Sequence, residues 1–181
     1  MYGGFNAIIS QLAEKIGEPF SSFPAKALWY GAGGVNMWGT ICGAVNGVSL
    51  AIALLVPQDD IFIVGSEIMD WYCKTPLPTN KLDEYTGVYN QVKCTPTSPL
   101  CHISRTRWEE AAGDHAPEES AYRCCKLVGD TAAKAVEILN AYHEGKFVAT
   151  FKKPESVSEC KSCHPEAYGI LDCTACHEPH K

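Results

Sequence analysis

Two identical Cys-x-x-Cys-His units near the C-terminal end constrain this chain more than any other feature. Both lie within the stretch "CKSCHPEAYGILDCTACH", residues 160–177. The first consists of Cys160, Cys163 and His164, and the second of Cys173, Cys176 and His177. Few large apolar residues follow Phe151, so burial alone cannot order this part of the chain. We therefore expect a covalent group or a metal ion to order it.

Two chemistries use cysteines at this spacing. In a zinc site, four thiolates from two Cys-x-x-Cys units bind one tetrahedral ion. In covalent haem c, two cysteines form thioethers with the porphyrin and the following histidine binds its iron. Positions i, i+3 and i+4 share one face of a helical turn, as this second chemistry requires. Only haem attachment needs a histidine directly after each second cysteine, and both units have one.

The repeated histidine favours two covalent haem c groups per chain over a zinc-stapled binding module. The predicted thioether residues are Cys160, Cys163, Cys173 and Cys176, and the predicted proximal iron ligands are His164 and His177. A redox dithiol at these motifs is disfavoured, because neither lies in a strand–helix context. The connection between the two units spans at most roughly 35 Å when fully extended, and less with helical turns at both motifs. Haems this close exchange electrons quickly, which suits a relay.

Each haem iron has a second axial position to fill. Four histidines remain as candidate distal ligands: His102, His115, His143 and His180. Met37 and Met69 lie in apolar segments and are expected in the core. We expect bis-histidine ligation of both irons, which closes them to small ligands and gives lower potentials than methionine ligation. The chain is thus predicted to be an electron carrier and not an enzyme. The alternative is a haem-dependent reductase with one open iron.

The rest of the sequence predicts a mainly α protein. A small helical domain, residues 1–145, is followed by a largely irregular haem-binding tail, residues 146–181. Apolar residues at helical spacing predict helices over residues 5–16 and 61–74. Between them, the glycine-rich stretch 30–36 leads into a further predicted helix that ends at about Val56. Proline and threonine predict irregular structure to about Ser104. The longest predicted helix follows Pro117 and ends near Gly145. Its apolar stripe is Ala121, Cys125, Val128, Ala132, Val136 and Leu139.

Charge and apolar patterning bear on location and partners. The formal net charge of −6 argues against nucleic acid as a partner, and redox proteins are the expected ones. The apolar stretch from Thr40 to Pro57 is interrupted by polar residues and glycines, so it predicts a core helix and not a membrane span. Covalent haem is attached outside the cytoplasm. We therefore expect a periplasmic or extracellular protein whose signal segment is absent from the printed chain.

Six further cysteines lie outside the haem motifs: Cys42, Cys73, Cys94, Cys101, Cys124 and Cys125. In an exported protein the plain interpretation is two or three disulfides. Six cysteines allow about 15 complete pairings, so the sequence alone does not choose among them. An iron–sulfur cluster is the alternative, because its thiolate ligands can come from separate segments.

Four stretches together resemble the split-Soret cytochrome c family. They are "GGVNMWGTICGAVNG" (residues 33–47), "SPLCHISRTRW" (98–108), "YRCCKLVGDTAAKAVEILNAY" (122–142) and the paired haem motifs. The resemblance covers roughly residues 30–181. Its central part is similar to redox proteins named for a C-GCAxxG-C-C cysteine pattern. Members of the split-Soret cytochrome c family are exported dihaem cytochromes.

The resemblance implies a mainly helical subunit and a homodimer with haems packed together at one end. It implies bis-histidine ligation that can draw on the partner subunit, and an iron–sulfur site away from the haems. By position, Cys42, Cys101 and one of Cys124 or Cys125 match the cluster cysteines. Glu109 stands where the pattern has a further cysteine, a departure that weighs against the cluster. The alternatives are that Cys73 or Cys94 takes its place, or that the site holds disulfides instead. A polymer with haem contacts between successive subunits is a variant of the same expectation.

Overall fold

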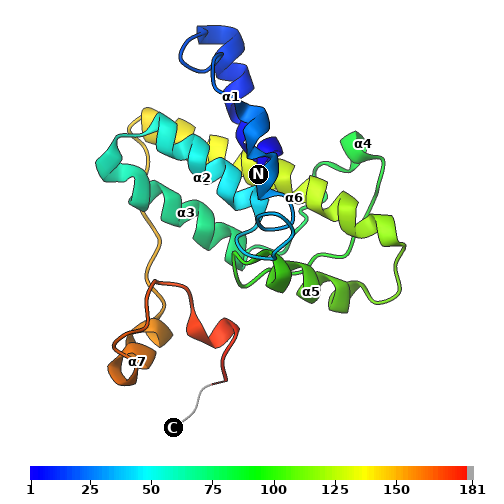
Figure 1. Cartoon of the computed structure of the whole chain (residues 1–181), viewed down its shortest axis with the longest axis vertical. Coiled ribbons are helices and arrows are strands. Elements are labelled where there is room, and N and C mark those ends of the chain that lie inside the picture. The colour runs from blue at the N-terminus through cyan, green and yellow to red at the C-terminus, as the bar shows by residue number, and fades with distance from the viewer. Residues whose placement is uncertain (179–181) are drawn as a thin grey trace. The chain divides into compact units, whose positions relative to one another are not determined.

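The computed structural model describes residues 1–178 and divides into two compact units (Figure 1). The first unit is Met1–Ala149, and the second begins at Thr150. The mainly α prediction is confirmed. Over the described residues no strand forms, and the only extended pairings are two isolated antiparallel bridges, Ile41 with Leu100 and Leu77 with Cys94.

Most of the first unit is helical. Its helices are α1 (Tyr2–Ile16), η1 (Ala25–Gly31), α2 (Gly43–Leu55), η2 (Gln58–Asp60), α3 (Ile61–Lys74), α4 (Asp83–Thr86), α5 (Cys101–Ala112) and α6 (Pro117–His143). Helix α2 begins only at Gly43, later than the apolar pattern indicated. The chain before it forms turns, in which Gly33, Gly34 and Gly39 have positive φ angles. The prediction of irregular structure to about Ser104 is wrong at its end, since α5 begins at Cys101.

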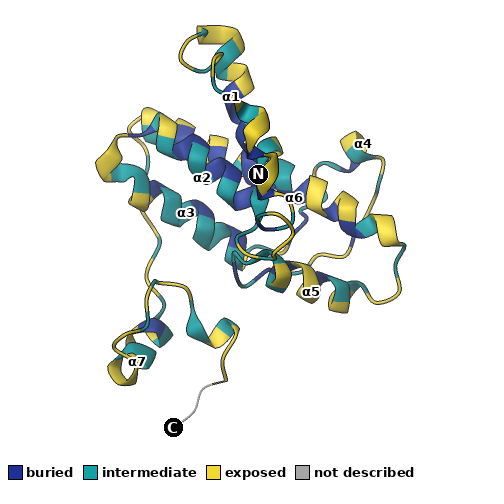
Figure 2. Cartoon of the chain, in the orientation of Figure 1, coloured by how far each residue is buried: buried dark blue, intermediate teal, exposed yellow. Residues whose placement is uncertain are grey.

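Helices α1, α2, α3 and α6 enclose the main core, and their facing sides are buried (Figure 2). Phe5 of α1, Val48 and Ile52 of α2, and Val64 and Ile68 of α3 are all fully buried. The backbones of α1 and α2 approach closely. A Cβ atom added at Gly47 would lie 3.0 Å from the backbone nitrogen of Phe5. Glycine is therefore required at this crossing.

Buried polar side chains of α6 tie the irregular segment 75–100 to the helical core. The ammonium group of Lys126 lies 2.5 Å from the Asp83 carboxylate. The Asp130 carboxylate accepts a hydrogen bond from the backbone N–H of Thr79 at 2.7 Å. These partners offset the cost of taking charges out of water. They hold a segment that has almost no regular structure of its own.

The predicted apolar stripe of α6 is only partly the buried face. Ala132 and Leu139 are buried, but Ala121, Cys125 and Val136 are exposed. In the N-terminal half of α6 the buried positions belong instead to Arg123, Lys126, Leu127, Asp130 and Thr131. Hydropathy alone predicted the wrong face there, because the buried polar groups find their partners in distant parts of the chain.

The second unit contains one helix, α7 (Glu155–Cys163), and one short 3-10 turn, η3 (Cys173–Ala175). Between residues 150 and 178, Val157 is the one buried residue. Polar contacts fix the local turns: Asp172 accepts hydrogen bonds from Ser156 at 2.7 Å and from the backbone of Thr174 at 2.9 Å. None of the described helices is long and apolar enough to cross a bilayer.

Replacing Phe5 tests the helical core. Its side chain is fully buried and its ring lies 4.6 Å from that of Phe23, centroid to centroid. Phe5→Ala should lower the free energy of unfolding by about 3–5 kcal/mol, because it leaves a cavity. The control is Phe62→Ala, at a residue 83% exposed, for which we expect a change within about 0.5 kcal/mol. Urea unfolding followed by circular dichroism measures both. An equal loss of unfolding free energy in Phe5→Ala and Phe62→Ala would contradict the position of Phe5 in the core.

The Asp83–Lys126 pair predicts a pH-dependent stability. A hydrogen bond from Lys126 lowers the pKa of the Asp83 carboxyl below its usual value. A lowered folded-state pKa stabilises the fold above the unfolded-state pKa of about 3.9, and this stabilisation is lost as pH falls through the folded value. Asp83→Asn should therefore lower the urea midpoint strongly at pH 7, and the gap to wild type should shrink in acid.

The matched control for Asp83→Asn is Asp70→Asn. Asp70 forms an ion pair with Lys74 within α3, and the Lys74 side chain is largely exposed. Such surface pairs contribute about 0–1 kcal/mol, so the urea midpoint should change little at either pH. A gap between wild type and Asp83→Asn that stays constant down to acid pH would refute the role assigned to this buried ion pair.

Candidate haem-attachment motifs and a buried thiol pair

The two Cys-x-x-Cys-His motifs are closed by the same backbone hydrogen bond, although the first is α-helical and the second is a 3-10 turn. The first occupies the last turn of α7, and the second occupies η3 and the residues after it. In each motif the histidine N–H donates to the carbonyl of the first cysteine at 2.9 Å, from His164 to Cys160 and from His177 to Cys173. This i to i+4 bond places both cysteines and the histidine on one face of a turn.

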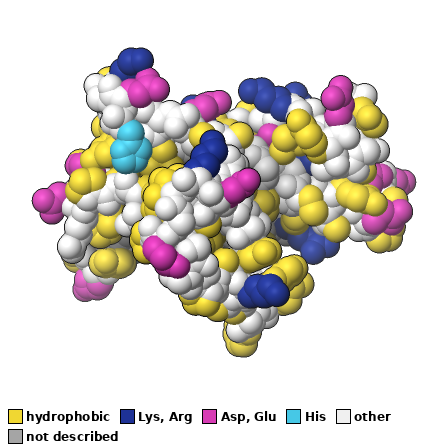
Figure 3. All heavy atoms as spheres, turned by 90° about the horizontal axis from the view of Figure 1, so that it is seen from above, with side chains coloured by type: hydrophobic (Ala, Val, Ile, Leu, Met, Phe, Trp, Pro, Cys, Tyr) yellow, Lys and Arg dark blue, Asp and Glu magenta, His cyan; other side chains and the backbone are white. Residues whose placement is uncertain are grey.

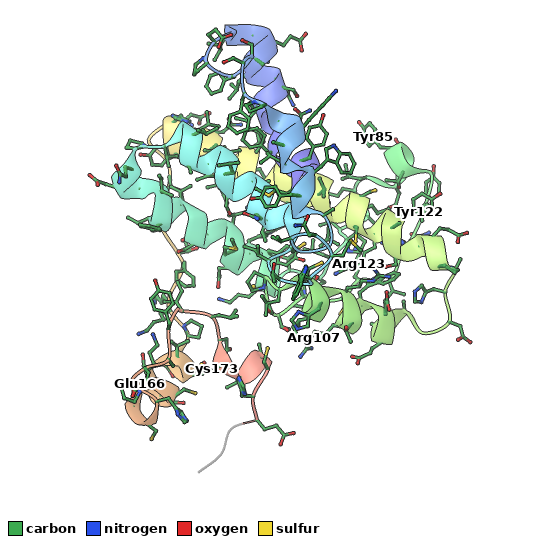
Figure 4. All side chains as sticks on the ribbon, viewed as in Figure 1. Tyr85, Arg107, Tyr122, Arg123, Glu166 and Cys173 are labelled. Carbon is green, nitrogen blue, oxygen red and sulfur yellow. The ribbon has the colours of Figure 1, made fainter. Side chains whose placement is uncertain are left out.

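The two motifs also lie next to each other within the second unit. The pKa of the Cys160 thiol is raised, first by loss of water around it and then by a hydrogen bond with Cys173. These are the first cysteines of the two motifs (Figure 4 labels Cys173). Groups attached at the two motifs would therefore be neighbours.

The residues of the second unit fit covalent haem attachment. Cys163, Cys176, His164 and His177 are all exposed, as are the apolar side chains of Tyr168, Ile170 and Leu171. This unit thus presents thiols, imidazoles and apolar surface without a packed core, and a porphyrin bound through its edge would supply one. Within residues 1–178, no three His, Cys, Asp or Glu side chains have the spacing to hold a metal ion directly.

His102 and His115 hold their rings in the orientation that metal-binding histidines use. His102, in the first turn of α5, has its Nδ1 2.8 Å from the carbonyl of Gly39. His115, between α5 and α6, has its Nδ1 2.7 Å from the carbonyl of Gly113, and its ring packs edge-on against Trp108. A carbonyl only accepts, so each Nδ1 donates to it, and Nε2 is the ring nitrogen left to bind a ligand.

His143 ends α6 beside a cavity. Its ring packs edge-on against that of Tyr142 at 5.4 Å, centroid to centroid. A cavity of about 450 Å³ is lined by Tyr142, His143, Gly145 and Phe147. The aromatic lining suits the edge of a flat apolar group. The fourth candidate, His180, lies outside the described residues.

A half-buried thiol pair, Cys42 and Cys101, lies in the first unit. Cys42 is the N-cap of α2 and Cys101 is the first residue of α5, so two helix N-termini converge on the pair. The Cys42 N–H donates to Pro99 at 2.7 Å, and the Cys101 N–H donates to Thr40 at 2.6 Å. These bonds flank the antiparallel bridge between Ile41 and Leu100. The two cysteines are thus held together by the backbone itself.

The surroundings of the thiol pair favour a negative charge on Cys42. A hydrogen bond from the Cys101 thiol is the largest influence and lowers the pKa of Cys42 to about 6, although burial opposes it. A hydrogen bond from Tyr72 and the charge of Arg123 lower this pKa further. The same contact with Cys42 raises the pKa of the Cys101 thiol. Cys42 is therefore the more acidic member.

A relay of hydrogen bonds connects the thiol pair to Arg123. The Tyr72 hydroxyl lies 2.8 Å from the Ser104 hydroxyl, which accepts a hydrogen bond from Arg123 Nη2 at 2.9 Å. Arg123 is 2% exposed and extends from α6 toward α5, with its guanidinium 5.7 Å from the ring centroid of Trp108 (Figure 4). Nothing in the sequence pattern marked Tyr72 or Arg123, because both read as ordinary helical positions.

The other cysteines are placed differently. Cys124, beside Arg123 in α6, is an exposed residue. The pKa of its thiol is raised, first by loss of water around the sulfur and further by the charge on Cys42, so the sulfur lies near the pair. Cys125 is exposed. Burial raises the pKa of Cys73 to about 12, and the Cys94 sulfur donates to the Arg107 carbonyl at 3.4 Å. All ten cysteines are free thiols in the structure, so the disulfide expectation finds no bonded pair.

Surface charge is mixed. Acidic and basic side chains are interspersed on the face shown in Figure 3, with apolar side chains between them. This pattern forms no basic stripe of the kind that binds nucleic acid on that face. The absence of a basic stripe on this face is consistent with the formal net charge of −6 for the whole chain.

Comparisons with known proteins match both parts of the chain. Residues 4–138 match the family described as "Putative redox-active protein (C_GCAxxG_C_C)". The curated split-Soret cytochrome c of Desulfovibrio desulfuricans is 36% identical over 188 aligned positions, which cover 97% of this chain and 67% of that protein. A solved structure, described as showing a novel iron centre in the split-Soret cytochrome c of the same species, has a TM-score of 0.87 and 35% identity. The match covers 99% of this chain and 80% of that one.

These matches confirm the resemblance drawn from the four sequence stretches, and the structural match confirms the helical fold. The similarity extends through the doubled motif, since it covers almost the whole chain. We conclude that this chain belongs to the split-Soret cytochrome c family, a family of redox cytochromes.

Proposed function

We propose that this chain is an exported dihaem c-type cytochrome that relays electrons between redox proteins. In this proposal Cys160 and Cys163 bind one haem, and Cys173 and Cys176 bind the other. His164 and His177 are the proximal iron ligands. Bound haem supplies one-electron chemistry at iron. The observation that carries the proposal is the backbone hydrogen bond shared by the two motifs, from the histidine N–H to the carbonyl of the first cysteine, at 2.9 Å in each.

The polypeptide's part is to place the two haems and to control access to their irons. Cys160 and Cys173 lie within contact of each other, so the tethers keep the haems close enough for fast exchange of electrons. Distal ligands from among His102, His115, His143 and His180 would close both irons. His102 and His115 support this role through their anchored Nδ1 atoms, and His143 supports it through its aromatic cavity.

Self-association fits the same proposal. The segment from η1 to α2 exposes large apolar side chains: Trp29, Met37 and Trp38 are 64%, 73% and 83% exposed. The expectation that Met37 lies in the core is therefore wrong, because it stands in the turns before α2. Apolar patches of this kind mark contact surfaces. We propose that they take part in a homodimer or a longer assembly, in which a neighbouring subunit could supply a distal histidine.

Haem content after cysteine replacement tests the attachment sites. Wild type, produced with its export signal in cells that mature cytochromes c, should carry two haems per chain in a pyridine haemochrome assay. Replacing both Cys160 and Cys163 by alanine should halve this content, because one haem loses both thioethers. Replacing all four motif cysteines should abolish it.

The control for this assay is Cys94→Ser, in the first unit, which should keep both haems. The helical signal in circular dichroism should persist in every variant, because the main core lies in residues 1–149. A colourless wild type, or full haem content after loss of the four motif cysteines, would refute the proposal.

Carbon monoxide distinguishes the relay from a reductase. With histidine on both faces, neither reduced iron offers an open position, so the reduced spectrum should not change when the gas is added. Each of the four distal candidates is replaced by alanine in turn. Where the replaced histidine is a distal ligand, its iron should become open and bind carbon monoxide rapidly. Rapid binding by wild type at one haem would instead favour the reductase. No response from any of the four variants would contradict distal ligation by these histidines.

A further inference from the structure

Polar bonds, and not a packed core, hold the two attachment motifs together in the second unit. Val157 is the one buried residue in the described part of this unit. Helix α7, which ends in the first motif, is bonded near both of its ends to the segment that precedes the second motif. Ser156 Oγ donates to Asp172 Oδ1 at 2.7 Å, and Lys161 Nζ donates to the Gly169 carbonyl at 2.7 Å. We call these two bonds the motif brace.

The brace acts directly on the tethering cysteines. Lys161 stands between Cys160 and Cys163 of the first motif, and Asp172 directly precedes Cys173 of the second. A shift of either brace residue therefore moves a tethering cysteine with it. The Cys-x-x-Cys-His pattern requires no particular residue at either position, so these two side chains are free to serve a purpose other than attachment.

A single oxygen of Asp172 joins the two motifs. Besides the bond from Ser156 of α7, its Oδ1 accepts from the backbone N–H of Thr174 at 2.9 Å and from the Thr174 hydroxyl at 2.6 Å. The carboxylate thus caps the 3-10 turn η3, which presents the second motif, and ties that turn to the helix of the first. Hydrogen bonds to a charged group are stronger than those between neutral groups. Asp172 can therefore hold this turn without apolar packing.

The carboxylate before the first motif is placed differently. Glu159 precedes Cys160 just as Asp172 precedes Cys173. Glu159 is exposed to solvent, whereas Asp172 is partly enclosed and bonded to α7. The brace is therefore not a consequence of the repeated motif. Glu159 also offers a control with the same charge at the same position relative to its motif.

We propose that Asp172 and Lys161 are positioning residues for the haem pair: the motif brace sets the distance and the angle between the two attached haems, and so the speed with which electrons pass between them. This inference rests on the proposed attachment of both haems. Neither residue has to touch a haem iron. A segment with few buried apolar contacts moves readily, so without the brace the two motifs would take up many relative positions.

The test is circular dichroism in the Soret band, the strongest absorption of haem, of the exported and haem-loaded protein. Two haems held close together at a fixed angle couple, which gives a pair of bands of opposite sign whose size falls steeply with distance. Ser156→Ala removes one brace bond without changing a charge, and Lys161→Met removes the other. Each should weaken the band pair. The double variant should lose most of it and still carry two haems per chain in the pyridine haemochrome assay.

Matched controls separate the brace from charge and from general damage. Ser158→Ala, at an exposed serine of α7, and Lys153→Met, at an exposed lysine of the same unit, should leave the band pair unchanged. Glu159→Gln removes a charge next to the first motif and should also leave it unchanged. Asp172→Ala should weaken the band pair, whereas Asp172→Asn should weaken it less, because the amide oxygen still accepts hydrogen bonds.

Several outcomes would overturn the proposal. One is a haem-loaded wild type without the band pair, and another is a band pair of wild-type size in the double variant. A third is equal weakening in Ser156→Ala and Ser158→Ala. The last is weakening that occurs only with a change of assembly state in sedimentation, because the coupling would then join haems of different subunits.

The haem assay on the same samples separates this inference from the proposed function. A wild type without haem refutes the proposed function and the brace with it. A wild type with two haems and variants that keep its band pair refute the brace alone. The single variants carry the result if the double variant attaches less haem.

Discussion

A segment that buries one side chain cannot order itself by burial. Residues 150–178 are in that position, with Val157 alone enclosed. Their turns are set by local polar contacts, such as those of Asp172 with Ser156 and Thr174. The side chains of Tyr168, Ile170 and Leu171 are exposed, as are the second cysteines of the two motifs, Cys163 and Cys176. A covalently bound flat group fits this arrangement because it would be both the core and the function of the segment.

The first unit is organised differently, around α6. Its C-terminal half contributes apolar residues to the core with α1, α2 and α3. Its N-terminal half uses Arg123, Lys126 and Asp130 to hold α5 and the irregular segment 75–100. Removing one member of a buried pair leaves an uncompensated charge, which costs several kcal/mol, roughly 3–5. The cysteine-bearing loops are thus fixed by polar contacts, and the helices by apolar ones.

The sequence predicted what depends on local spacing. The mainly α class and most helix positions follow from patterns within a few residues, such as i, i+3 and i+4, and so does the prediction of haem attachment at the doubled Cys-x-x-Cys-His motif. The face of α6 was predicted wrongly at Ala121, Cys125 and Val136, because hydropathy does not reveal that Lys126 has a partner at Asp83. Tyr72 and Arg123 went unnoticed for the same reason. Their relevance comes from Ser104 and Cys42, which lie far away in the chain.

The family assignment makes this chain a member of a family of redox cytochromes, and the doubled motif is the proposed place of haem attachment. The central claim is covalent attachment of two haems. Intact-mass measurement of the exported protein in a denaturing organic acid tests it most directly, because this treatment removes haem that is held only by coordination. We expect the mass of the mature polypeptide plus two haems. The mass of the bare polypeptide would contradict the account.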